Sequence, residues 1–182
     1  MYNRDKNLVA ITPSGIEYFE MKPEDIVITT PEGDIIEGDR KPSSELGMHL
    51  AIYHKRADVN AVVHTHSKYA SVLACMGWEI EPVHYLIGLA GKTIRCAEYA
   101  TYGTQELVTK LVDVMDERNA VLLSNHGLIA WGPQLEKAFA TALHLEYVSE
   151  LNYLTRTAGE PKLISDSMMD DVMKKFNTYS YK

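Results

Sequence analysis

Three histidines are the side chains in this sequence best suited to bind a metal ion. His64 and His66 are separated by one residue at the end of an apolar segment, and His126 follows a second apolar segment, residues 120–123. Side chains at positions i and i+2 of an extended chain project from one face about 6–7 Å apart. Two imidazoles can therefore converge on one ion, although the pair alone could equally be two polar residues that end a strand. With His126 on a neighbouring strand, three ligands and an open position would favour a catalytic zinc site.

Glu45 is the best candidate for a proton-transfer group, because it stands where a helix is expected to begin. The alternative is purely structural, since the helix dipole favours a carboxylate in the first turn whatever its function. Ser43 and Ser44 offer hydroxyls, and a helix start offers free N–H groups, so together they could bind a phosphate. Ser14 and Gly15 could supply further donors from a turn, although a plain turn explains them without any ligand.

The composition limits the class of protein. The chain has 182 residues, of which 46% are hydrophobic and 24% charged, so we expect one globular domain. Lys and Arg number 18 against 25 Asp and Glu, and the net charge of −7 argues against nucleic acid as a partner. No segment approaches the ~20 apolar residues of a membrane span, and the start resembles no signal peptide. We therefore expect no membrane partner and a cytoplasmic location.

Alternating and helical patterns of apolar residues predict a mixed α/β layout, a sheet with helices packed on its faces. Strands are predicted at 7–12, 25–30, 34–37, 60–64, 93–97, 120–123 and 127–131. Helices are predicted at about 44–55, 69–76, 103–115, about 133–157 and 165–176.

Six segments, in order along essentially the whole chain, resemble the class II aldolase/epimerase family. They are ITPSGIEY (11–18), KPSSE (41–45), AVVHTH (61–66), HYLIGLAG (84–91), YATYGT (99–104) and LLSNHGLIA (122–130). The resemblance implies a single domain over residues 1–182, a three-layer α/β/α fold around a central, largely antiparallel sheet. It also implies a homotetramer with active sites between subunits and one Zn²⁺ per subunit.

The resemblance assigns a role to each candidate. It makes His64, His66 and His126 the zinc ligands and Glu45 the acid/base. The residues that it assigns to the substrate phosphate are Ser14, Gly15, Ser43 and Ser44. The tyrosines that it assigns are Tyr85, which a neighbouring subunit supplies to protonate the aldehyde oxygen, Tyr102, which lines the aldehyde pocket, and Tyr179, which closes the site from the tail.

The implied reaction is the reversible cleavage of L-fuculose 1-phosphate to dihydroxyacetone phosphate and L-lactaldehyde, with zinc as the Lewis acid. The chain contains no lysine in a recognisable Schiff-base context, which agrees with a metal as the electron sink. The alternatives are a pentulose-5-phosphate 4-epimerase, a rhamnulose-1-phosphate aldolase, a methylthioribulose-1-phosphate dehydratase, or a truncated zinc-binding form without activity. Glu45 favours an aldolase, because the epimerases have Asp there.

One departure concerns the N-terminus. Members of the family begin with a further helix and a Gly-Asn loop that contributes to phosphate binding, whereas this sequence starts shortly before the first predicted strand. Either Met1 is an artificial or misassigned start, or this form is truncated, in which case both segments are absent and the phosphate pocket is incomplete.

Overall fold

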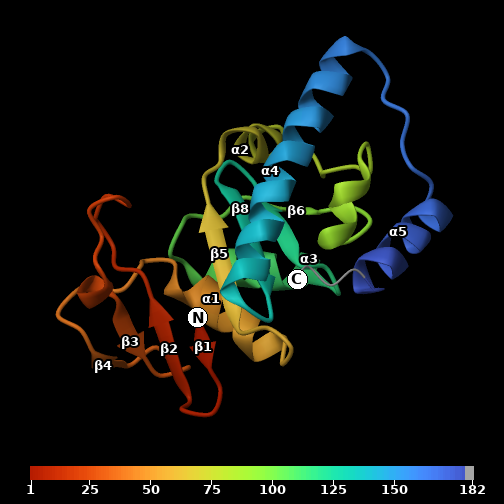
Figure 1. Cartoon of the computed structure of the whole chain (residues 1–182). Coiled ribbons are helices and arrows are strands. Elements are labelled where there is room, and N and C mark those ends of the chain that lie inside the picture. The colour runs from red at the N-terminus through yellow and green to blue at the C-terminus, as the bar shows by residue number, and fades with distance from the viewer. Residues whose placement is uncertain (179–182) are drawn as a thin grey trace.

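The strands form two four-stranded sheets in the computed structural model, which describes residues 1–178 (Figure 1). The first sheet is antiparallel throughout and has the order β1 (Tyr2–Asn3), β2 (Leu8–Ile11), β3 (Val27–Thr29), β4 (Ile35–Glu37). The second has the order β5 (Ala61–Thr65), β8 (Gly127–Gly132), β7 (Ala120–Leu123), β6 (Cys96–Ala97). This sheet is mixed, because β6 runs parallel to β7 while the other pairs are antiparallel.

Five α-helices and two short 3-10 helices complete the described part of the chain. The α-helices are α1 (Leu46–Lys55), α2 (Lys68–Cys75), α3 (Gln105–Met115), α4 (Leu135–Ala158) and α5 (Asp166–Thr178). The 3-10 helices are η1 (Pro23–Asp25) and η2 (Tyr85–Leu89). Even the longest of these described helices, α4, lacks a stretch apolar enough to cross a bilayer.

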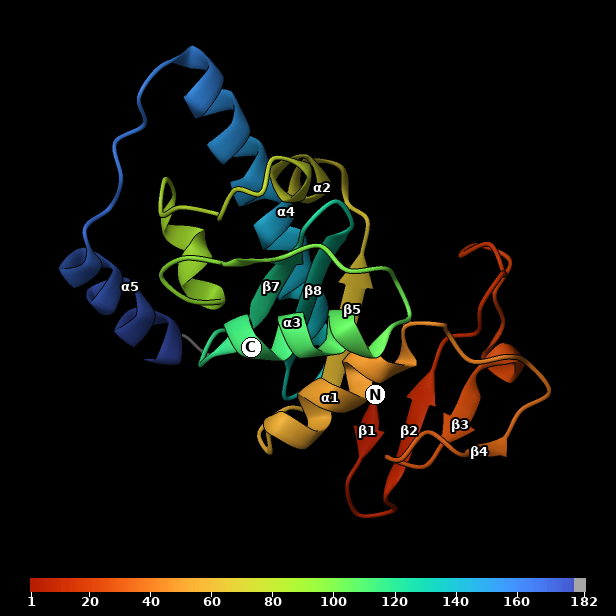
Figure 2. The same cartoon turned by 180° about the vertical axis from the view of Figure 1, so that it is seen from behind.

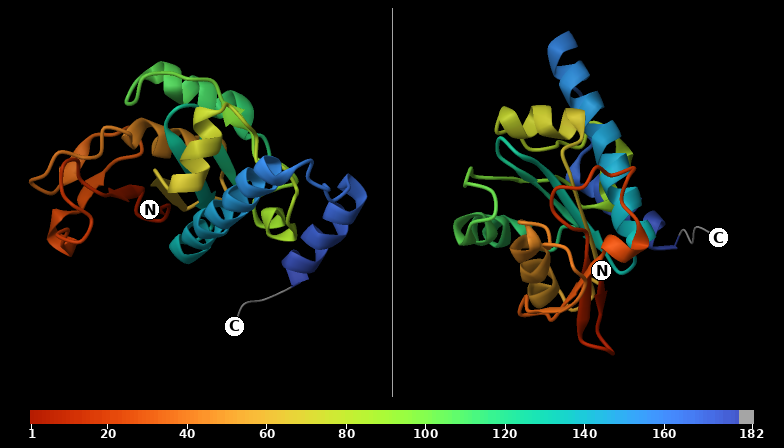
Figure 3. Two further views of the ribbon diagram at one scale, coloured as in Figure 1. Left: turned by 90° about the horizontal axis from the view of Figure 1, so that it is seen from above. Right: turned by 90° about the vertical axis from the view of Figure 1, so that its left-hand side faces the viewer.

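Strand β7 shows why the second sheet is buried on both faces. All four of its side chains are inaccessible to solvent, and successive side chains of a strand point to opposite faces. Val121 and Leu123 pack in the core that includes residues of α1 and α3, whereas Ala120 and Leu122 pack in the core formed with α2 and α4. The helices therefore cover both faces of this sheet, as the edge-on view in Figure 3 and the rear view in Figure 2 show.

The expectation of a single central sheet is met only in part. The first sheet meets the second where the N–H of Tyr2 donates to the carbonyl of Asn60 at 2.7 Å, just before β5 begins. Because β1 is only two residues long, it does not continue as a paired neighbour of β5. The mixed α/β class is confirmed, and the strands divide between two sheets.

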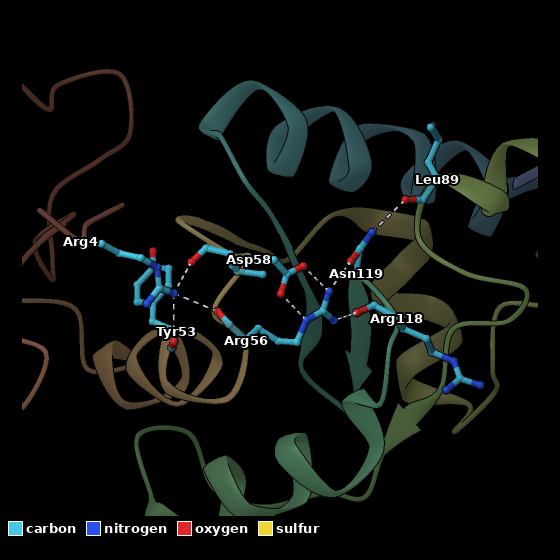
Figure 4. A network of polar contacts seen from close by, with 8 residues as sticks. Arg4, Tyr53, Arg56, Asp58, Leu89, Arg118 and Asn119 are labelled. Carbon is cyan, nitrogen blue, oxygen red and sulfur yellow. Dashed lines mark hydrogen bonds and ion pairs between the residues drawn. The ribbon is translucent and has the colours of Figure 1, made fainter. Parts of the chain in front are cut away.

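Two arginines hold the end of the second sheet where β5 begins (Figure 4). The Arg4 guanidinium donates to the carbonyls of Tyr53, Arg56 and Val59 at 2.9–3.2 Å, which fastens the first sheet to the C-terminal end of α1. Arg56 in turn forms a two-bond ion pair with Asp58, at 2.8 Å for each bond. This network stabilises the end of β5 opposite to the one that carries the histidines.

Candidate metal centre

Three imidazoles and one carboxylate converge at the C-terminal end of β5. The Nε2 atoms of His64 and His66 lie 3.0 Å apart, and Glu45 places Oε2 2.9 Å from His64 Nε2 and Oε1 3.1 Å from His126 Nε2. One ligand atom from each of the four residues lies within 4.8 Å of the others. The structure thus brings together two residues from one segment, a third from a distant hairpin and a fourth from the start of a helix.

The pairing of β5 with β8 explains how His126 reaches the other two histidines. Thr65 lies opposite Leu128 in this antiparallel pair, so the turn that precedes β8 faces the end of β5. Gly127 has no room for a side chain, because a Cβ there would collide with the carbonyl oxygen of Thr65. Asn125 adopts the left-handed conformation (φ +54°), which asparagine tolerates better than most residues. The Asn-His-Gly sequence is therefore what allows the hairpin turn to lie against β5.

The tautomer of His64 follows from its second contact. Its Nδ1 lies 2.9 Å from the carbonyl oxygen of Leu128, and a carbonyl can only accept, so Nδ1 carries the proton and donates. In the neutral ring the lone pair is then on Nε2, which faces His66 and Glu45. A backbone acceptor that orients an imidazole in this way is typical of metal-binding histidines.

The charges of the cluster also suit a cation. Burial favours the neutral form of Glu45, but its contacts with His126 and His64 outweigh this effect and hold the pKa of the carboxyl well below its usual range. Burial and the neighbouring His64 and His126 lower the pKa of His66. Around neutral pH the site therefore presents an anionic carboxylate together with a neutral His66.

This donor set fits a divalent metal ion. Glu45 Oε1 is buried and has no hydrogen-bond partner of good geometry in residues 1–178, although His126 Nε2 is only 3.1 Å away. An oxygen and a nitrogen this close, both directed into the cluster, are placed as two ligands of one metal ion would be. Three imidazole nitrogens with a carboxylate oxygen match the ligands that Zn²⁺ accepts in tetrahedral sites. Glu45, which the sequence singles out only for proton transfer, thus also stands among the candidate ligands.

A cavity of about 390 Å³ opens beside the cluster. The residues that line it are Ser44, Glu45, His66, Tyr99, Ala100, Tyr102, Asn125 and His126. Ser44 and Tyr102 were predicted from the sequence to line the site, whereas Tyr99 and Asn125 were not. The signal for Asn125 was its place directly before His126, and Tyr99 belongs to the same segment, 99–104, as Tyr102.

The hydroxyls of Ser14 and Ser43 bond to nearby backbone groups. Ser14 Oγ accepts from the N–H of Ser44 at 3.1 Å and donates to the carbonyl of Pro42 at 3.0 Å. Ser43 Oγ accepts from the N–H of Glu45 at 3.2 Å. The N–H groups of Ser44 and Glu45, which the sequence suggested would be free at the helix start, therefore already have partners. Gly15 adopts a left-handed conformation (φ +77°) and lines a separate hollow that includes Arg40.

Two of the predicted tyrosines lie apart from the cluster or outside the described residues. Tyr85 is in η2, half-exposed, with its ring against those of His84 and Phe176, and it does not line the cavity of its own chain. Its role as a residue supplied to a neighbouring subunit stays a prediction. Tyr179 lies outside the residues that the structure describes.

The fold and the cluster agree with the sequence comparison at the level of the family. A family model described as the class II aldolase and adducin N-terminal domain matches residues 2–153, and the chain belongs to this family. The chain is an enzyme of the class II aldolase type, a carbon–carbon lyase, as its named relatives are.

Three relatives show how similar the chain is to known members. It is 51% identical to the 5-deoxy-D-ribulose 1-phosphate aldolase of Bacillus thuringiensis serovar kurstaki over 179 residues, which cover 98% of this chain and 84% of that one. It is 42% identical over 170 residues to the 5-methylthioribulose-1-phosphate/5-deoxyribulose-1-phosphate aldolase of Rhodospirillum rubrum, covering 93% and 76%. A solved structure of an L-fuculose 1-phosphate aldolase superposes with a TM-score of 0.94 at 45% identity, covering 97% and 83%.

Proposed function

We propose that the chain is a metal-dependent aldolase that cleaves 5-deoxy-D-ribulose 1-phosphate to dihydroxyacetone phosphate and acetaldehyde. The observation that carries the proposal is the convergence of three imidazoles and Glu45 beside a cavity of about 390 Å³, of a size that suits a small ligand. The choice of sugar is supported by the 51% identical relative, whose name gives this substrate. The reaction breaks the C3–C4 bond; the C4 hydroxyl loses its proton, and C3 gains one.

His64, His66 and His126 would hold a Zn²⁺ ion, one per subunit, and Glu45 lies close enough to act as a fourth ligand when no substrate is present. When bound there, the metal ion supplies positive charge that draws electrons from the ketone carbonyl as the carbon–carbon bond breaks. The carboxylate of Glu45, anionic around neutral pH, would remove the proton from the hydroxymethyl carbon in the condensation direction and return it to C3 in cleavage. Glu45 therefore acts at the carbon atom rather than at the leaving aldehyde.

The other residues of the proposal bind or enclose the substrate. Ser14, Gly15, Ser43 and Ser44 would receive the phosphate, which requires the serine hydroxyls to exchange backbone partners for phosphate oxygens. Tyr102 would line the aldehyde pocket. Tyr85 of a neighbouring subunit would protonate the aldehyde oxygen in condensation, and Tyr179 would cover the site.

This arrangement needs an assembly, and we propose the homotetramer that the resemblance implies, with each active site between subunits. Support comes from apolar side chains on the outer face of α4, Phe139, Leu143, Tyr147 and Leu154, each of them exposed in the single chain. A cytoplasmic location stays a prediction from the sequence.

L-Fuculose 1-phosphate is the second candidate substrate, because a solved structure with that substrate in its name superposes at a TM-score of 0.94. The two sugars share the phosphate-bearing end and differ in the aldehyde, which is acetaldehyde for the first and L-lactaldehyde for the second. The choice between them therefore depends on the aldehyde side of the cavity, which we assign to Tyr102 together with its neighbour Tyr99, two residues that line the cavity.

The test is a product assay with the zinc-loaded chain. We expect dihydroxyacetone phosphate and acetaldehyde from 5-deoxy-D-ribulose 1-phosphate, with a kcat/KM above that for L-fuculose 1-phosphate, and no epimerisation of ribulose 5-phosphate. A higher kcat/KM for L-fuculose 1-phosphate would reverse the order of the two substrates. Bound zinc without turnover of either sugar would refute the proposal in favour of a non-catalytic zinc-binding form.

A further inference from the structure

The helix that follows the His64/His66 pair, α2, begins without a capping side chain of its own. The first N–H groups of a helix have no partners within it, and the N-cap residue Ser67 makes no side-chain cap bond. Instead, the N–H groups of Tyr69 and Ala70 donate to the two carboxylate oxygens of Glu146, at 2.8 and 2.9 Å. A carboxylate is well suited to this position, because it also meets the positive end of the helix dipole. The start of α2 is thus fixed by a side chain from the middle of α4.

Both ends of α2 are connected to the metal centre. His66 lies two residues before the helix begins at Lys68. At the other end, the carbonyl of Ala74 accepts from the N–H of Asn125 at 3.1 Å, and Asn125 directly precedes His126. Figures 1 and 2 show α2 lying beyond the end of β5 and beside α4. A shift of α2 would therefore change the distance between the imidazoles of His66 and His126.

We propose that Glu146 is a positioning residue for the metal centre, which sets the distance between His66 and His126 by fixing α2 on α4. The inference rests on the proposed function, because it takes the three histidines as metal ligands. Glu146 is neither a member of the four-residue cluster nor a lining residue of its cavity. It acts through the two backbone N–H groups of α2, and its removal would leave these donors without their partner and loosen the helix between the two histidines.

The test compares Glu146→Gln and Glu146→Ala with the wild-type chain in two measurements. One is the affinity for Zn²⁺ in competition with a chromogenic chelator, and the other is the visible absorption spectrum of the Co²⁺-loaded protein, which reports the geometry of the ligands. We expect Glu146→Ala to weaken Zn²⁺ binding by about 10- to 100-fold, the usual effect of losing a residue that orients metal ligands, and to change the Co²⁺ spectrum. We expect a smaller loss in Glu146→Gln, whose amide oxygen can still accept one of the two bonds.

The matched control is Arg156→Ala, which removes other contacts of α4, the 2.6 Å ion pair from Arg156 to Glu81 and the stacking of its guanidinium on the Trp78 ring, but leaves the bonds from Glu146 to α2 in place. We expect this variant to keep the Zn²⁺ affinity and the Co²⁺ spectrum of the wild type. Wild-type affinity and spectrum in both Glu146 variants would overturn the inference, as would an equal loss in the control. If Glu146→Ala does not fold, the Zn²⁺ affinity and the Co²⁺ spectrum of Glu146→Gln alone test the inference. A wild-type chain that binds no metal would instead overturn the proposed function.

Discussion

Glu45 lies between His64 and His126, and this position determines what a substitution there should do. We predict that Glu45→Gln keeps its bound zinc, because three imidazoles remain, and loses about 100- to 10,000-fold in kcat, the usual contribution of a proton-transfer group. The amide is similar in shape to the carboxylate but cannot take up a proton near neutral pH. Zinc content and kcat for aldol cleavage, measured on one preparation, test the prediction.

The control for this substitution is Glu98→Gln, since Glu98 has a side chain that is 87% exposed. Glu98→Gln should keep the wild-type kcat, which would show that the change in net charge alone does not lower kcat. A kcat near the wild-type value in Glu45→Gln would remove Glu45 from the chemistry.

Gly127 is a second residue at which a small change should have a large effect. A Cβ at this position would collide with the carbonyl oxygen of Thr65 and come within 3.1 Å of the His66 ring. We predict that Gly127→Ala displaces the hairpin turn, lowers the free energy of unfolding by about 1–3 kcal/mol, as overpacking generally does, and weakens Zn²⁺ binding. Urea denaturation and chelator competition measure the two effects.

Gly47→Ala is the matched substitution, because a Cβ there meets Val108 at an ordinary 3.4 Å inside helix α1. Because alanine has the higher helix propensity, this substitution should leave the free energy of unfolding unchanged or raise it. Equal effects of the two alanines would contradict the reason given for Gly127.

At the scale of single residues, the sequence predicted the candidate ligands well because they follow apolar strands. His64 and His126 stand at strand ends, and the neighbouring β5 and β8 bring them to one edge. The sequence placed Glu45 at the site as the acid/base but did not predict it as a candidate ligand, because only the packing of α1 determines how far the residue that precedes this helix reaches. Nor did it predict that Ser14 and Ser43 accept bonds from backbone N–H groups, since hydroxyls can serve either backbone or ligand.

At the scale of elements, Arg4 connects the first sheet to helix α1. Its guanidinium donates to the carbonyls of Tyr53 and Arg56 at the end of that helix (Figure 4). It also donates to the carbonyl of Val59 and to the side chain of Asn60, just before β5. We predict that Arg4→Ala lowers the free energy of unfolding by about 1–2 kcal/mol, because carbonyls lose a charged donor, while the zinc affinity is unchanged. The control Lys6→Ala changes an exposed lysine in the adjacent turn and should have little effect. Equal unfolding midpoints in urea for the two variants would contradict this role of Arg4.

The elements that were not predicted from the sequence depend mainly on contacts with other parts of the chain. The five α-helices were predicted within a few residues, because each has apolar residues at helical spacing over two turns or more. Strand β1 has two residues, too few for any alternation, and depends on pairing with β2. Helix η2 is covered by α5, with Gly88 close to Val172 and Phe176, and its five residues carry no periodic pattern of their own.

At the scale of the whole molecule, the outer face of α4 carries a row of exposed apolar side chains. Phe139, Leu143 and Tyr147 follow one another at intervals of four residues, so they form one stripe along the helix, and their exposed fractions are 57%, 59% and 46%. Large contiguous apolar surfaces of this kind generally mark interfaces. Tyr147 also contacts the ring of His84, next to Tyr85. A subunit that covers this stripe would therefore approach Tyr85 as well.

Leu143→Glu should consequently break the assembly, because it puts a charge at the centre of the stripe, where burial without a partner is costly. We predict that light scattering after size exclusion gives a smaller species for this variant than for the wild-type chain. Because Tyr85 would no longer reach a neighbouring site, kcat should fall while the isolated subunit keeps its zinc and its far-UV circular dichroism. Lys162→Glu, which places the same charge on an exposed position after α4, should change neither mass nor kcat. A monomeric wild-type chain with full activity would contradict the shared active site, and an unchanged mass for Leu143→Glu would show that the subunits meet elsewhere.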